Sequence, residues 1–205
     1  NGFARELGIS SLDMAISIIE QNKLCTIDLM ICEFKRKDIW HRKYALSTSG
    51  LGYIADTAAF AARHLKHMRD LCYPIATLFT LFNQSVKSAD ILIDGGPAKR
   101  IEFTNFIVNN TSYAGNFCIF PEADFMDAKL NMGFARTNAL TQVLSNASVI
   151  TKRYFHYPAV KQPIRSLSVV IDKPRIFMLD GEIYNCVKEI RYSVAARKLK
   201  LITRQ

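Results

Sequence analysis

The chain has 205 residues, of which 49% are hydrophobic and 22% are charged, and this balance is typical of a folded globular protein rather than a disordered one. No apolar run approaches the roughly 20 residues that a membrane-spanning helix needs, and no secretory signal opens the chain. The formal net charge of +9 indicates either a surface that tolerates the excess charge or a polyanionic partner, for which nucleic acid, an anionic membrane and nucleotide phosphates all qualify.

The motifs and the cysteines indicate which class of partner and which cellular compartment to expect. The sequence contains no zinc finger, no RNP-like aromatic motif and no other known nucleic-acid-binding module, so nucleic acid is not an expected partner. The five cysteines are odd in number and scattered, with neither a CxxC pair nor a zinc-like Cys/His spacing. Such cysteines predict reduced thiols in the cytoplasm.

The first elements expected are a helix and two strands. Residues 10–22 predict a helix, in which Ser10 and Asp13 form a start that resembles a capping box. The period of the apolar residues then changes to two over residues 24–34, which predicts a strand. A second strand is expected over residues 43–50.

Two helices are expected next. Residues 53–71 are rich in alanine, and Pro74 opens a second apolar helix in the first turn, where proline is tolerated. Asp56 and Arg63 are seven residues apart, so they share a helical face on which Phe60 lies between them. This face is either a solvated rim, or a site in which the carboxylate binds a polar group and arginines bind phosphates.

After residue 86 the pattern becomes largely β. Residues 89–111 alternate with a period of two around an Asp-Gly-Gly-Pro turn at 94–97, which predicts a hairpin. A short helix is expected over residues 137–148. Further strands are expected at residues 116–120, 129–135, 164–172, 175–180 and 188–196. The predicted fold class is therefore α+β and mainly β, with a few helices in one region.

The segment RIFMLDGEIYN, residues 175–185, places Asp180, Gly181 and Glu182 between two apolar runs. Asp-Gly in this setting is a strong signal for a tight hairpin turn. A carboxylate beside such a turn could equally orient a hydroxyl or hold magnesium in phosphoryl transfer. The segment alone leaves both interpretations open.

Five segments resemble, in the same order, motifs of the diacylglycerol kinase and sphingosine kinase superfamily of lipid kinases. They are NGFARELGI at residues 1–9, STSGLGYIAD at 47–56, RHLKHMR at 63–69, the stretch from IVNN to NM at 107–132, and LDGE at 179–182. Each segment is a loose match alone. Five matches in the family's order make a specific resemblance, which extends over most of the chain.

The resemblance implies a two-domain enzyme that uses ATP and Mg²⁺ to phosphorylate a lipid hydroxyl. Residues 1–23 would be the tail of an N-terminal α/β nucleotide-binding domain. Residues 24–205 would be the C-terminal domain, a β-sandwich of the NAD kinase and diacylglycerol kinase-like type that holds the lipid. The family's GGDG and GTG glycines are absent from the sequence, so this chain alone is expected to lack the N-terminal half of the active site.

The resemblance also implies roles for single residues. Glu182 matches a glutamate that is the proton acceptor in bacterial relatives and faces Mg-ATP in sphingosine kinases, and Asp180 would help with magnesium. The implied nucleotide-binding residues are Asn1, Arg63, Arg69 and Gly181. The implied substrate-binding residues are Ser47, Ser49 and Asp56. A structural magnesium is implied at Asp124, Asp127 and the backbone carbonyl of Lys129.

The expected substrate is a sphingoid base or a diacylglycerol-like lipid, and the expected partners are an anionic membrane surface and the N-terminal domain of the same protein. The protein is thus expected in the cytoplasm and peripherally at the membrane. Two alternatives stay open. One is a non-catalytic lipid- or phosphate-binding module, because Met126 and Ala128 depart from the family's metal motif. The other is a soluble nucleotide kinase of NAD-kinase-like architecture. A homodimer also stays open.

Overall fold

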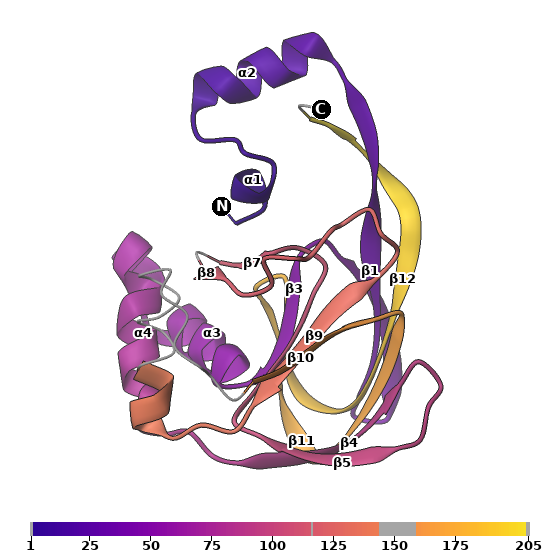
Figure 1. Cartoon of the computed structure of the whole chain (residues 1–205). Helices are drawn as coiled ribbons and strands as arrows, with labels where there is room; N and C mark the ends of the chain where they lie inside the picture. Colours follow the sequence, from indigo (N-terminus) through magenta and orange to yellow (C-terminus); the bar gives the residue numbers. More distant parts are fainter. Residues whose placement is uncertain (1, 116, 144–158, 204–205) are drawn as a thin grey trace.

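The structure, a computed structural model, describes residues 2–115, 117–143 and 159–203. Antiparallel strands dominate it, and the helices lie along one flank and near the N-terminus (Figure 1). The predicted mainly-β α+β fold is confirmed. The helices are α1 (Gly2–Glu6), α2 (Leu12–Gln21), α3 (Tyr53–His64), the 3-10 helix η1 (Lys66–Leu71) and α4 (Cys72–Leu81).

The strands follow in chain order, most of them after α4. They are β1 (Leu24–Arg36), β2 (Ile39–Ala45), β3 (Thr48–Gly52), β4 (Lys87–Ile93), β5 (Lys99–Phe103), β6 (Asn105–Asn109), β7 (Tyr113–Ala114), β8 (Phe117–Cys118), β9 (Leu130–Ala135), β10 (Ala159–Ile164), β11 (Ser166–Leu179) and β12 (Glu182–Ile202). Of the strand predicted at 116–120, residues 117 and 118 form β8, residues 119 and 120 are not in a strand, and residue 116 lies outside the described residues. Of the helix predicted over 137–148, residues 139–143 are helical, and 144–148 lie outside the described residues.

All strands except β7 and β8 form one antiparallel sheet. Eight of them follow the order β10-β9-β6-β3-β11-β12-β1-β2, and β4 and β5 branch from this path. Strand β11 is the branch point. Its first half, around Val169, pairs with β4, which in turn pairs with β5. Its second half, from Phe177 to Leu179, pairs with β3. The sheet therefore divides along β11, and its branches enclose the main hydrophobic core.

Large side chains from both branches fill this core. Phe34, Phe103, Phe106 and Phe177 are at most 1% exposed, and the Phe34–Phe177 and Phe103–Phe106 ring centroids each lie 5.4 Å apart. Burial of each such ring contributes about 1.5–3 kcal/mol. The period-two pattern of the sequence supplies these residues because alternate side chains of a strand face the same side of the sheet.

The predicted Asp-Gly turn is confirmed. Asp180 and Gly181 have φ values of 46° and 88°, and they join a pair in which Leu179 lies opposite Glu182. Positive φ at both central residues defines the two-residue hairpin turn that matches the twist of a sheet. The tight turn places Asp180 and Glu182 at the end of the hairpin.

Several predicted boundaries are wrong. The helix predicted over 53–71 ends at His64 and is followed by the 3-10 helix η1. The strand predicted over 43–50 is two strands, β2 and β3, between which the chain bends at Leu46 and Ser47. The strands predicted at 164–172 and 175–180 are one strand, β11, because a register irregularity absorbs the polar residues after Val170. Helix α2 is capped by Ser11 rather than Ser10, since the Ser11 hydroxyl accepts the Met14 N–H at 3.2 Å.

Helices α3 and α4 pack together beside the sheet (Figure 1). Helix α3 starts directly at the end of β3, where Gly52 has a φ of 76° and an added Cβ would lie 2.2 Å from the Thr104 carbonyl oxygen. The Thr57 and Thr80 hydroxyls bond at 2.7 Å between the two helices. Pro74 lies in the first turn of α4, as predicted.

No helix among the described residues combines the length and the apolar character that crossing a bilayer requires. The predicted division at residues 23 and 24 coincides with the start of β1 at Leu24. The assignment of the preceding residues to another domain stays a prediction.

Candidate active site

Asp180 fastens the hairpin turn to the bend between β2 and β3. Its carboxylate accepts the N–H groups of Leu46 at 2.5 Å, Ser47 at 3.0 Å and Thr48 at 2.8 Å. Its own N–H donates to the Thr48 carbonyl oxygen at 2.7 Å. A carboxylate that accepts several backbone N–H groups holds a loop in a fixed shape. The geometry therefore gives Asp180 a positioning role at this end of the sheet.

A cluster of hydroxyl groups adjoins this bend. The Ser47 hydroxyl lies 2.8 Å from the Thr111 hydroxyl and 3.2 Å from that of Thr48. Ser47 was predicted to bind substrate, and the structure places it here with Asp180. Ser49, predicted with it, is fully buried and donates to the Tyr192 hydroxyl at 3.0 Å. Ser49 is therefore part of the core.

Asn110 and Asp28 extend the network inward. The Asn110 side-chain amide donates to the carbonyl oxygens of Asp28 at 2.9 Å and Leu46 at 3.2 Å. The fully buried Asp28 carboxylate accepts the N–H groups of Ala128 and Arg197, each at 2.7 Å. Sequence reasoning missed both residues. A carboxylate inside the apolar run CTIDLMI was the available signal, because a buried charge must be paired or hydrogen-bonded.

The residues of the predicted magnesium site lie in the loop that Asp28 anchors. Asp124 accepts the Met126 N–H at 2.9 Å, and Asp127 accepts the Lys129 N–H at 2.9 Å. The Lys129 ammonium group is also 3.7 Å from Asp127. Within the described ranges, no three Asp, Glu, His or Cys side chains lie close enough to hold a metal ion. These contacts do not assemble a cation site, and the metal assignment stays a prediction.

Glu182 is the exposed acid of the turn. Its carboxylate accepts a hydrogen bond from the Tyr184 hydroxyl, two residues along the same strand. The Tyr184 ring rests on Phe34, with the ring centroids 4.6 Å apart. The tyrosine thus orients the carboxylate from a fixed position in the sheet. An exposed, oriented carboxylate can accept a proton from a hydroxyl group or bind a metal ion that accompanies phosphates.

Burial and, secondly, the hydrogen bond to Glu182 raise the pKa of Tyr184 from 10.0 to about 12. Because the folded-state pKa is the higher one, protonated Tyr184 stabilises the fold below pH 10, and this stability is lost as the pH rises towards 12. We expect Tyr184→Phe to lessen the alkaline fall in the free energy of unfolding, measured by urea titration from neutral pH upward. An identical fall in both proteins would contradict this assignment.

Helix α1 docks against the same end of the sheet. The Glu6 carboxylate accepts the Ser112 N–H at 3.1 Å and the Ser112 hydroxyl at 2.9 Å. The Arg5 guanidinium lies 5.8 Å from the centre of the Tyr113 ring. Residues 110–113 therefore connect α1 to the bend held by Asp180. Asn1, the predicted nucleotide-binding residue of this segment, lies outside the described residues.

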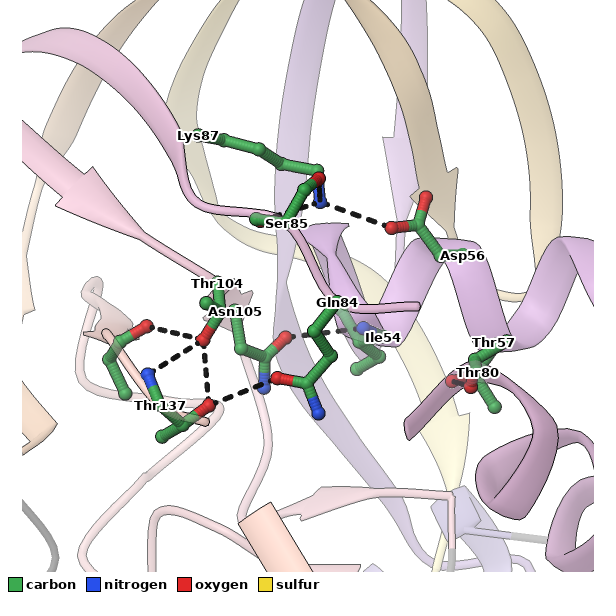
Figure 2. A network of polar contacts seen from close by, with 11 residues as sticks. Ile54, Asp56, Thr57, Thr80, Gln84, Ser85, Lys87, Thr104, Asn105 and Thr137 are labelled. Carbon is green, nitrogen blue, oxygen red and sulfur yellow. Dashed lines mark hydrogen bonds and ion pairs between the residues drawn. The ribbon is translucent and has the colours of Figure 1, made fainter. Parts of the chain in front are cut away.

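The predicted residues of α3 lie on one helix, but their contacts differ from the expectation. Asp56 forms an ion pair with Lys87 at 3.2 Å, and the Lys87 side chain is only 4% exposed (Figure 2). Lys87 also donates to the Ser85 carbonyl oxygen. Arg63 is exposed at the end of α3, and Arg69 belongs to η1, although its side chain is outside the described part. The Asp56 carboxylate is thus already neutralised by a buried lysine, which sequence reasoning missed.

Figure 2 shows how the start of α3 is held beside this ion pair. Gly52 offers no side chain to cap the helix, and Asn105 of β6 accepts the Ile54 N–H at 3.2 Å instead. Next to it, the Thr104 and Thr137 hydroxyls bond at 2.7 Å, and Thr137 reaches Gln84 at 3.2 Å. The polar network therefore fixes α3 to β6 and to the turn after α4.

Asp180→Asn is expected to lower the free energy of unfolding by about 1–2 kcal/mol, because an amide cannot accept all three N–H groups. Asparagine tolerates the positive φ at this position. The change therefore tests only the capacity of the side chain to accept the three N–H groups. Asp38→Asn is the matched control, since Asp38 also has positive φ but is 96% exposed. Denaturant titration with hydrogen exchange at residues 46–48 measures both. Equal stability of the two variants would refute the positioning role.

Comparison with known proteins gives a match at the level of structure. No protein-family profile and no curated protein sequence matches the chain. A candidate diacylglycerol kinase from Bacillus anthracis str. Sterne matches with a TM-score of 0.74 and 17% identity, over 100% of this chain and 65% of the other. A diacylglycerol kinase from the same source matches with a TM-score of 0.67 and 15% identity, over 100% and 63%.

A more distant match is yeast NADH kinase complexed with NADH. Its TM-score is 0.54 at 12% identity, and the match covers 94% of this chain and 49% of the other. The chain spans less than two thirds of the diacylglycerol kinase structures that it matches. The motifs of the sequence and the comparison of structures agree, and the chain has the fold found in diacylglycerol kinase and NADH kinase structures.

Proposed function

We propose that the chain is part of an ATP-dependent lipid kinase that transfers the γ-phosphate of ATP to the hydroxyl of a sphingoid base or a diacylglycerol-like lipid. The observation that carries this proposal is the exposed Glu182 carboxylate, which Tyr184 orients beside a turn fixed by Asp180. The likeness to diacylglycerol kinase structures supports it at the level of the fold.

In the proposed reaction the oxygen of the lipid hydroxyl attacks the γ-phosphorus, and the bond between this phosphorus and the β,γ-bridging oxygen of ATP breaks. The hydroxyl proton passes to the Glu182 carboxylate, and ADP leaves with the bridging oxygen. Magnesium, held with the nucleotide, would offset the charge of the phosphates. Because Asp180 already accepts three N–H groups, we assign it to hold the turn, and we assign the proton to Glu182.

Other parts of the site would come from the nucleotide-binding half of the protein. The chain spans 65% of a diacylglycerol kinase structure, and α1 already contacts Ser112 beside the candidate site. The exposed Arg63 is a suitable ligand for ATP phosphates, because guanidinium groups bind phosphate oxygens in pairs. The role of Arg69 stays a prediction.

The ion pair of Asp56 bears on the choice of lipid. A sphingoid base carries a cationic amine, which would need an unpaired carboxylate. Asp56 is paired with Lys87 at 3.2 Å, so a second cation there would meet repulsion from the buried ammonium group. We therefore favour a lipid that carries a hydroxyl but no amine, such as a diacylglycerol or a monoacylglycerol.

A phosphorylation assay of the intact protein over a panel of lipids tests this function. The panel contains sphingosine, ceramide, diacylglycerol and monoacylglycerol, with NADH as the arm for a soluble nucleotide kinase. We expect labelled phosphate on an acylglycerol and none on NADH. Label on NADH alone would support the nucleotide kinase, which the match to yeast NADH kinase favours. Absence of label on every acceptor would support a non-catalytic binding module.

A further inference from the structure

Arg36 of β1 and Arg175 of β11 lie on either side of strand β12. In the register of the sheet both are opposite the same residue, Val187. Directly opposite residues of an antiparallel pair place their side chains on the same side of the sheet, and Val187 is fully buried in the core. The two arginine side chains therefore leave the sheet on its inner side, from main chains two strand spacings, roughly 9–10 Å, apart.

Neither arginine has all of its donors satisfied. Both residues are half-buried. The Nε atom of each is buried, and among the described residues no acceptor lies within hydrogen-bond distance of it. A buried donor without an acceptor costs free energy. An acceptor that comes from outside the chain would therefore be bound favourably between the two side chains.

The acidic residues nearest to this pair along the three strands are each paired with another cation. These ion pairs are Lys35–Asp38 at 3.4 Å, Arg100–Asp172 at 2.5 Å and Arg191–Glu189 at 2.8 Å. The fold thus brings two guanidinium groups to one place, and the neighbouring carboxylates are already neutralised. Because like charges repel, this arrangement favours an anion that neutralises both.

Further cations lie close to the pair in the sequence. Each is one or two residues from Arg36, Arg175 or Val187, and each is exposed: Lys37, Lys173 and Lys188. A group of cations of one sign raises the local positive potential and concentrates anions near the surface. The surroundings therefore favour an anion of high charge density.

We propose that Arg36 and Arg175 bind a phosphate group between them, as a free ion or as part of a larger phosphorylated molecule. Guanidinium groups donate parallel pairs of hydrogen bonds to phosphate oxygens. A phosphate group carries a charge between about −1.5 and −2 and has three acceptor oxygens, so one such group can serve both arginines. A carboxylate has a single charge and would neutralise only one of them.

This phosphate site is separate from the candidate active site. Arg175 lies four residues before Leu179, which is opposite Glu182. About 13 Å of strand therefore separates the arginine pair from the Asp-Gly turn. Binding can be measured without phosphate transfer, so a kinase assay that gives no product would leave this proposal standing.

Equilibrium dialysis of the intact protein against labelled inorganic phosphate, ATP and glycerol 3-phosphate, at constant ionic strength, tests the proposal. We expect at least one of these probes to bind, and the double variant Arg36→Gln, Arg175→Gln to bind that probe about tenfold or more weakly. Arg36→Lys, Arg175→Lys retains both charges but loses the paired N–H groups, so its affinity should be intermediate. The probe that binds most tightly identifies the source of the phosphate as a free ion, a nucleotide or a lipid head group.

The matched control is Lys99→Gln, Arg165→Gln, which removes two exposed cations from other parts of the chain. It should bind the probes like the unchanged protein. Urea titration is the second measurement. Without phosphate, the double glutamine variant should be at least as stable as the unchanged protein, because two neighbouring like charges are removed. Added phosphate should stabilise the unchanged protein but not this variant, since a ligand stabilises only the fold that binds it.

Failure of all three probes to bind, or equal binding by the unchanged protein and the glutamine variant, would overturn the proposal. An equal loss of binding in the control would also overturn it, because the effect would then follow from net charge alone. If the glutamine variant unfolds at a lower urea concentration in phosphate-free buffer, and phosphate does not stabilise the unchanged protein, the two arginines have a structural role instead.

Discussion

Replacing Glu182 by glutamine is expected to lower the rate of lipid phosphorylation by about 10²- to 10⁴-fold, the range that a positioned general base contributes. The neutral amide cannot take the proton of the lipid hydroxyl. It retains the shape of glutamate, and its carbonyl oxygen can still accept the Tyr184 hydroxyl. Because Glu182 is exposed, we expect the free energy of unfolding to change by less than about 0.5 kcal/mol.

The measurement is the initial rate of phosphate transfer by the intact protein at saturating ATP, with urea unfolding of the same preparation. Glu189→Gln is the control, because it also removes a carboxylate from β12. The Glu189 carboxylate pairs with Arg191. It should retain the full rate. A Glu182→Gln protein that is fully active would remove the catalytic assignment. If the Glu182→Gln protein is inactive and its free energy of unfolding is also lower, Glu182 has a structural role instead.

Asp28→Ala is expected to cause the largest loss of stability, roughly 2–4 kcal/mol, because it leaves two backbone N–H groups without an acceptor inside the protein. Asp28 is fully buried, and it joins Ala128 in the loop before β9 to Arg197 in β12. Both partners have positive φ, 58° and 49°. The carboxylate therefore holds two backbone segments in conformations that non-glycine residues seldom adopt.

Urea titration of three proteins measures this effect. Asp28→Asn should lie between the unchanged protein and Asp28→Ala, since an amide oxygen can accept one N–H while its NH₂ group faces the other donor. Hydrogen exchange at residues 124–129 should be faster in both variants. If Asp28→Ala unfolds at the same urea concentration as the unchanged protein, the two hydrogen bonds contribute nothing to stability.

Local patterns predicted the elements whose structure is decided locally. The Asp180-Gly181 turn follows from the demand for positive φ at two central residues. The helix predicted over 53–71 is observed over 53–64, and the strand predicted over 24–34 is observed over 24–36; both follow from their apolar periods. The bend at Leu46 and Ser47 could not be predicted in this way, because the acceptor of its N–H groups, Asp180, lies 132–134 residues later.

The candidate site could likewise be predicted only where it depends on local sequence. The Asp-Gly-Glu motif located Asp180 and Glu182, but the sequence could not show that Asp180 is occupied by backbone N–H groups. The buried partner of Asp56 was also hidden, because Lys87 lies 31 residues away and reads as an ordinary lysine at the start of a strand. Asp56 lies on a helix and Lys87 on a strand, so their pairing depends on how α3 packs in the tertiary structure, which local sequence patterns do not record.

The most direct test of the central claim is transfer of γ-labelled phosphate from ATP to a lipid in vesicles by the intact protein, with Glu182→Gln assayed beside it. The account predicts a labelled lipid phosphate from the unchanged protein and at least about a hundredfold less from the variant. Label that reaches no lipid, or that reaches lipid equally with both proteins, would contradict it.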